Sequence, residues 1–204
     1  MEYMDLVRKR RSIRRYKPDP ISDRDLKTIL EAARLAPSWS NRQCWRYIIV
    51  TDQSIKEKLA KAGEKWVNEA PVIVVVCADP RTSGHKPGME YFMVDIGISF
   101  KHLVLAATNL GIGTCWIGAF DAEQVKEALG VPSEIRVVAY TALGYPDEKK
   151  GRVFARKPLR DICFYERYGQ AKSQGLQGAV TGTIGNLYIK GRKLSEKLRN
   201  RLTS

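Results

Sequence analysis

The feature that most constrains the fold of this chain is the apolar run Pro-Val-Ile-Val-Val-Val-Cys-Ala at residues 71–78. Many of its residues are β-branched, which favours a strand, and polar and apolar side chains do not alternate along it. A strand that is apolar on both sides must be covered on both of its faces. Residues 71–78 therefore predict the central strand of a sheet that is flanked by helices.

Strand and helix patterns alternate along the rest of the sequence. Strands are predicted over residues 45–50, 112–118 and 135–143. Helices are predicted over residues 2–9, 91–110 and 122–129 and after the caps Ser22 and Asp52. This alternation predicts an α/β or α+β class, and the order of elements alone does not decide between a parallel and an antiparallel sheet. A chain of 204 residues with 44% hydrophobic content suits one domain.

Two segments rich in hydrogen-bond donors stand on either side of one predicted helix. The first is Arg-Arg-Ser-Ile-Arg-Arg-Tyr at residues 10–16, where guanidinium groups and a hydroxyl suit a phosphate. Such a basic cluster is also compatible with a solvated face or a nucleic-acid arm. The second segment, residues 37–43, leads directly into the strand at 45–50. Together the two segments predict one extended, phosphorylated ligand.

These two segments resemble the first and second flavin-binding segments of the FMN-dependent nitroreductase family. The patterns are Arg-x-Ser-x-Arg-x-Tyr from residue 10 and Pro-Ser-x-Ser-Asn-x-Gln-x-Trp from residue 37, and the likeness extends over about residues 4–168. Cys44 is a departure, because the family commonly has proline there and proline would make the loop more rigid. The resemblance implies FMN contacts from Arg10, Arg11, Ser12, Arg14, Pro37, Ser38, Ser40, Asn41, Gln43, Trp116, Ile117, Gly118, Arg156 and Lys157.

The last five of these residues belong to two further elements of the family pattern. Trp116, Ile117 and Gly118 resemble the element whose backbone approaches the flavin ring, where a glycine leaves room for a flat ligand. Without the other motifs, an ordinary strand end would explain them equally well. Arg156 and Lys157 stand in the family's C-terminal phosphate-binding position, and a solvated turn is the alternative.

The resemblance also implies the architecture and the assembly. It implies an α+β sandwich with a central mixed sheet, in an intertwined homodimer where residues 37–41 of one subunit cover the flavin of the other. The helix predicted at 91–110 is apolar almost all round, apart from Asp95, Lys101 and His102, so we expect it in both the core and the dimer interface. We assign residues 1–169 to the flavin-binding domain and 170–204 to a basic extension, which either packs on the partner or is solvated.

The sequence carries little acid–base machinery of its own. It has two His residues and no His-Glu-x-x-His, Gly-x-Ser-x-Gly, Walker or Gly-x-Gly-x-x-Gly motif, and its four Cys residues stand far apart, so no metal site is predicted. This fits an enzyme in which a flavin carries the chemistry. The resemblance implies a ping-pong oxidoreductase that takes electrons from NAD(P)H through FMN to a nitroaromatic or a quinone, with Arg14 as an electrostatic stabiliser.

Two other functions remain open on the sequence. Relatives with the same fold dehalogenate aromatic compounds or cleave flavin, and the net charge of +13 would also suit a nucleic-acid binder with a vestigial flavin site. Flavin and nicotinamide phosphates are anions as well, so charge does not separate these hypotheses. We expect a cytoplasmic protein with no membrane contact. His85, in the polar loop predicted at 81–88, either contacts the substrate or is simply exposed.

Overall fold

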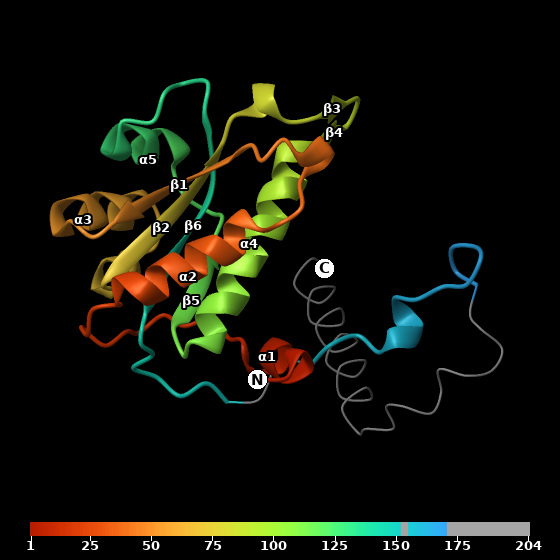
Figure 1. Cartoon of the computed structure of the whole chain (residues 1–204), viewed down its shortest axis with the longest axis horizontal. Helices are drawn as coiled ribbons and strands as arrows, with labels where there is room; N and C mark the ends of the chain where they lie inside the picture. The colour runs from red at the N-terminus through yellow and green to blue at the C-terminus, as the bar shows by residue number, and fades with distance from the viewer. Residues whose placement is uncertain (152–154, 171–204) are drawn as a thin grey trace, which may run out of the picture. The chain divides into compact units, whose positions relative to one another are not determined.

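The computed structural model describes residues 1–151 and 155–170, drawn in colour in Figure 1. The chain divides into two compact units, Met1–Gly151 and Arg152–Ser204. The predicted extension at 170–204 lies outside the described residues except for Gln170. The first unit contains the sheet and every helix longer than one or two turns that the structure describes.

The sheet of the first unit has four strands in the order β1-β2-β6-β5. They are β1 Trp45–Val50, β2 Val72–Ala78, β5 Gly113–Ile117 and β6 Arg136–Gly144. All three neighbouring pairs are antiparallel, and a single parallel bridge joins Ser12 to Thr114 beside β5. The α+β class is thus confirmed, and the described sheet is mixed only through that bridge. β2 is an inner strand and all seven of its residues are buried, as predicted from their apolar run.

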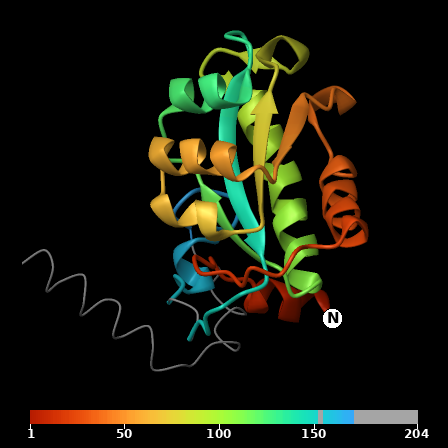
Figure 2. The ribbon, with the colours of Figure 1, turned by 90° about the vertical axis from the view of Figure 1, so that its left-hand side faces the viewer.

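Helices cover both faces of the sheet (Figure 2). The helices are α1 Tyr3–Lys9, α2 Asp23–Arg34, α3 Gln53–Ala62, α4 Tyr91–Asn109 and α5 Ala122–Leu129. Of these, α2 and α4 lie on one face and α3 and α5 on the other. On β2, Val74 and Val76 belong to the core cluster of α2 and α4, whereas Ile73, Val75 and Cys77 belong to that of α3 and α5. The absence of alternation in residues 71–78 therefore has a direct cause, since both faces of this strand are in contact with helices.

The helix ends follow the capping residues of the sequence. Ser22 Oγ accepts from the Asp25 N–H at 3.1 Å, and Asp52 Oδ1 accepts from the Ile55 N–H at 3.0 Å. Gly130 ends α5 with a left-handed φ of 65°, which glycine adopts without strain. Short elements complete the description: 3₁₀ turns at Trp39–Asn41, Lys65–Glu69, Pro80–Thr82 and Leu159–Asp161, and a hairpin of β3 His85–Lys86 and β4 Met89–Glu90.

The helix α4 is the central helix of the molecule. Phe92, Ile96, Phe100 and Leu103 are buried against the sheet and α2. Within the described residues α4 alone has the length and apolar composition of a candidate membrane span, and half of that stretch is buried inside the fold. Burial in a protein core accounts for much of its composition.

Candidate functional site

The first donor segment lies along the start of β5. The N–H of Ile13 donates to the carbonyl of Thr114 at 2.9 Å, and Ser12 pairs with the same residue in the parallel bridge. Gly113 makes this close approach possible, because a Cβ on it would lie 2.9 Å from the Cβ of Ile13. The local sequence therefore fixes residues 12 and 13 against the sheet, directly after the short helix α1.

Three donors of the first segment interact with the Cys115 thiol. They are Arg10, Ser12 and Arg14, which are alternate residues of an extended segment and so share one side of it. Burial raises the pKa of the Cys115 thiol, while the charge of Arg14, a hydrogen bond from Ser12 and the charge of Arg10 oppose that rise. Lys101 of α4 belongs to the same neighbourhood, since partial burial and the charge of Arg10 lower its pKa. The sequence identified three of these donors as a group and did not predict Lys101.

The side chain of Arg11 points away from the other donors of this segment. Its Nη1 donates to the carbonyl oxygens of Arg8 and Arg10 at 2.5 and 2.8 Å, at the C-terminal end of α1. It also lines a separate small cavity of about 200 Å³, together with Ile13 and Glu148. The structure thus does not bring Arg11 together with Arg10, Ser12 and Arg14, and we do not retain it in the proposed site.

Glu148 fixes the backbone of the same segment from outside the motif. Its carboxylate accepts from the N–H of Arg14 at 2.6 Å and from the ammonium of Lys150 at 2.7 Å. Burial alone would raise the pKa of Glu148, but the hydrogen bond of Lys150 and the backbone N–H groups of Arg14 and Arg15 outweigh it and lower the pKa. Arg14 also places its guanidinium carbon 6.0 Å from the ring centroid of Trp66.

The end of β5 leaves room for a flat ligand. Trp116 is 45% exposed and meets Phe100 edge-on, with ring centroids 4.5 Å apart. A Cβ on Gly118 would have only atoms of the Trp116 side chain within 4 Å, the nearest at 3.4 Å. A Cβ at this position would therefore have space, and the flavin contact of Gly118 stays a prediction.

The second donor segment lies at the N-terminal end of α4. It contains the 3₁₀ turn Trp39–Asn41. Just after this turn, the N–H of Gln43 donates to Ser38 Oγ at 3.0 Å. Ser40, Asn41 and Gln43 have left-handed φ values of 47°, 55° and 51°. Asn tolerates that conformation, whereas Ser and Gln seldom adopt it unless their surroundings impose it. The loop therefore has a fixed shape that other parts of the chain must support.

The two donor segments lie at opposite ends of α4 (Figure 1). The first contacts Gly113, just beyond the C-terminal end of α4, and the second contacts Asp95, near its N-terminal end. From Asp95 to Asn109 the helix rises about 21 Å at 1.5 Å per residue, and the charge of Arg10 reaches Lys101 in its middle. A single chain thus keeps apart the two segments that the sequence assigned to one ligand.

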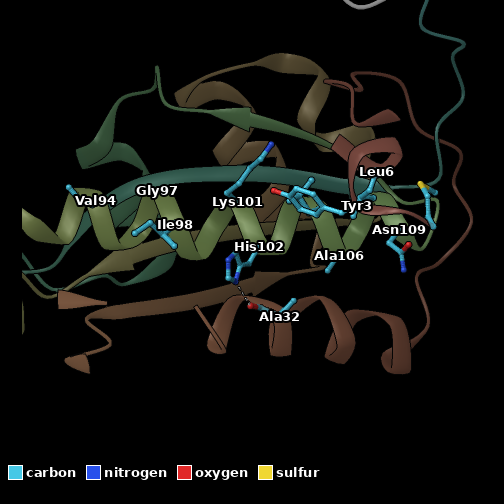
Figure 3. A pocket seen from close by; sticks show the side chains of 12 residues that line it. Tyr3, Leu6, Ala32, Val94, Gly97, Ile98, Lys101, His102, Ala106 and Asn109 are labelled. Carbon is cyan, nitrogen blue, oxygen red and sulfur yellow. Dashed lines mark hydrogen bonds between the residues drawn. The ribbon is translucent and has the colours of Figure 1, made fainter. Parts of the chain in front are cut away.

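A groove of about 810 Å³ runs along α4 between these ends. Figure 3 shows its lining, which comes mainly from α4 with contributions from α1 and α2. The residues are Met1, Tyr3, Leu6, Ala32, Val94, Gly97, Ile98, Lys101, His102, Leu105, Ala106 and Asn109. Most of them are apolar, so within the first unit a large apolar part of α4 is left without cover.

His85 lies in the hairpin of β3 and β4, where the sequence predicted an irregular loop. Its Nδ1 is 2.8 Å from the Glu90 carboxylate, and its side chain is 66% exposed. The Pro87-Gly88 turn, with a φ of 76° at Gly88, was the available signal for this hairpin. Arg156 and Lys157 are exposed residues of the second unit, and their assignment to the phosphate stays a prediction.

Comparison with known proteins agrees with this description. A family model described as the nitroreductase family matches residues 7–67 and 61–145. A Thermus thermophilus protein named NADH dehydrogenase is 34% identical over 190 residues, covering 77% of this chain and 92% of that protein. A Bacillus subtilis protein named FMN reductase (NAD(P)H) is 30% identical over 177 residues, covering 78% of this chain and 71% of that protein.

A solved structure is similar to this chain in fold. The crystal structure of a nitroreductase family protein from Clostridium novyi NT is 34% identical, with a TM-score of 0.70, over 84% of this chain and 97% of that one. The family match and the names of these relatives indicate an oxidoreductase. The chain belongs to the nitroreductase family, which confirms the resemblance found in its motifs.

Proposed function

We propose that this protein is an NAD(P)H-dependent FMN oxidoreductase whose flavin sites form only in a homodimer. In each site, one subunit supplies residues 10–14 and 116–118, and the other supplies the loop at 37–43. The observation that carries this proposal is the position of the two donor segments at opposite ends of α4, with an uncovered apolar groove between them. A second copy packed on that groove would bring the loop of one chain to the donors of the other.

The donors fit the phosphate of FMN. Arg10 and Ser12 offer a planar guanidinium and a hydroxyl on one side of an extended segment, the pattern that suits a phosphate group. Lys101 adds a further positive charge beside Arg10. The family resemblance also implies Arg156 as a phosphate donor, and that assignment stays a prediction.

The ring of the flavin fits the open backbone at Gly118, beside the exposed Trp116. When bound, FMN supplies the hydride and electron transfer between the reductant and the acceptor. The chain contributes position and charge, and the guanidinium of Arg14 favours negative charge near the ring. Within residues 1–151 and 155–170, no group of three or more His, Cys, Asp or Glu side chains could hold a metal ion.

NAD(P)H is the reductant, a role supported by the printed names of the relatives. The acceptor is a small oxidised aromatic compound, a nitroaromatic or a quinone, which follows the nucleotide into the same space in a ping-pong cycle. Trp116 gives that space an exposed aromatic wall.

An absorbance spectrum with the solution mass of the same sample tests this proposal. The purified protein should be yellow, should have the mass of a dimer and should oxidise NADH or NADPH when a quinone is added. A colourless protein that cannot be reconstituted with FMN would refute the flavin assignment. A monomer that carries FMN would refute the shared site.

A further inference from the structure

The carboxylate of Asp95 is buried in α4, with 2% of the residue exposed. Its Oδ1 accepts from the N–H of Trp39 at 2.8 Å, and its Oδ2 accepts from Ser83 Oγ at 3.0 Å and from Cys44 Sγ at 3.6 Å. A buried carboxylate is costly unless hydrogen bonds replace its lost water. Its three neutral donors come from two different segments of the chain.

Those two segments also contact each other directly. Trp39 and Cys44 belong to the loop at 37–44, and Ser83 belongs to the hairpin region at 79–90. The N–H of Asp79 donates to the carbonyl of Cys44 at 3.2 Å. A Cβ on Gly84 would lie 2.5 Å from the ring of Trp39, so only glycine lets this ring pack on the hairpin backbone. The loop and the hairpin region thus meet both at Trp39 and at Asp95.

We infer that Asp95 is a positioning residue that clamps the loop at 37–44 and the hairpin region at 79–90 into one lid over the flavin of the other subunit. The inference rests on the proposed function, because the lid is functional only if the loop covers a flavin. Ser40, Asn41 and Gln43 keep their left-handed conformations only while the loop is held. The clamp supplies that restraint, and the hairpin region thereby shapes the space that the acceptor enters.

Cys44 is part of the clamp. It is fully buried, and burial followed by the charge of Asp95 raises the pKa of its thiol to about 11. The thiol is therefore protonated at neutral pH and donates to the carboxylate. At the position where the resembled motif commonly has proline, this chain stabilises the loop with a hydrogen bond instead.

Three variants test the clamp. Asp95→Ala removes all three hydrogen bonds, Asp95→Asn keeps an oxygen that can accept from Trp39, and Ser83→Ala removes only the donor from the hairpin region. The matched control is Ser99→Ala. Ser99 is buried one turn further along α4 and bonds to the Ala33 carbonyl at 2.7 Å and to the Tyr47 hydroxyl at 2.6 Å, without contacting the lid through either bond.

The first readout is the labelling rate of Cys44 by a thiol reagent, followed by peptide mapping on the apoprotein. We expect Asp95→Ala to be labelled at least about tenfold faster than Ser99→Ala, because losing buried hydrogen bonds opens the loop. Asp95→Asn keeps the acceptor for Trp39 and Ser83→Ala removes one bond, so both should lie between the control and Asp95→Ala. Equal rates in Asp95→Ala and Ser99→Ala would overturn the clamp, as would labelling of Asp95→Asn as fast as that of Asp95→Ala.

The second readout is steady-state kinetics at saturating FMN. Asp95→Ala should raise the KM for a bulky quinone by about tenfold, the scale of one buried hydrogen bond, with a much smaller change in kcat. Ser99→Ala should leave both nearly unchanged. If Asp95→Ala does not fold, Ser83→Ala carries both readouts. A wild-type protein that binds no flavin would refute the proposed function, whereas the labelling would still decide the clamp.

Discussion

Replacing Arg10 tests the phosphate site, and the neighbouring Arg11 provides a control within the same segment. Both side chains are half-buried, and each substitution to Ala removes one positive charge. Arg10 acts at Cys115 and Lys101, where we place the phosphate, whereas Arg11 donates to the carbonyls at the end of α1. The two variants therefore remove the same charge, but from side chains that point to different places.

We expect Arg10→Ala to weaken FMN binding by about 2 to 3 kcal/mol, the scale of a hydrogen bond to a charged group at a partly desolvated site. This corresponds to about 30- to 150-fold in Kd. Arg11→Ala should change the Kd by less than about threefold, because its guanidinium points to the carbonyls at the end of α1 and salt screens its longer-range charge. It should instead lower the free energy of unfolding by about 1 kcal/mol, since α1 loses its C-terminal donor.

The assay is titration of FMN into apoprotein, followed by the quenching of flavin fluorescence at physiological ionic strength, with a thermal melt of each variant. Unchanged affinity in Arg10→Ala would remove this residue from the site. Equal losses in the two variants would show a general charge effect, which would refute the reasoning from side-chain direction.

Two further predictions concern packing and pH. Gly84→Ala should lower the melting temperature and cost about 1 to 3 kcal/mol, because its Cβ would lie 2.5 Å from the ring of Trp39; an unchanged melt would contradict that packing. Burial raises the pKa of Cys44 and of Cys77 from 9.0 to about 11, so both thiols stabilise the fold below pH 9 and lose this contribution as pH rises to 11. Each thiol should therefore contribute a fall of about 1.4 kcal/mol per pH unit in the free energy of unfolding. In urea titrations at pH 9 to 11, the slope of Cys77→Ala should be shallower than that of the wild type by about that amount.

Local patterns in the sequence were enough to predict the helices and strands of the fold. Residues 71–78 show on their own that β2 is covered on both faces, and Ser22, Asp52 and Asp121 each cap a helix within three residues. The strand predicted at 112–118 is one residue shorter at each end, Gly113–Ile117, because the chain leaves the sheet at Gly118. The pairing of the strands was not predictable, because antiparallel order depends on contacts between segments far apart in the sequence.

The candidate site was predictable only in part, for the same reason. The motifs identified the donor segments, but the direction of Arg11 depends on the carbonyls left open at the end of α1. The sequence marked Asp95 and Lys101 only as interruptions in an apolar helix. Their roles follow from Trp39 and Arg10, which are distant in sequence and become neighbours only in the folded chain.

The central claim, a flavin site made by two chains, is tested most directly by subunit complementation. One variant carries Arg10→Ala and Ser12→Ala, and a second carries Asn41→Ala and Gln43→Ala, so that each homodimer has two damaged sites. Co-expression with two different tags allows the mixed dimer to be purified. If each site uses both chains, the mixed dimer has one intact site and should bind one FMN per two chains with the affinity of the wild type. If each site is built from one chain, every site in the mixed dimer is damaged, and its FMN binding would be no better than that of the two parents.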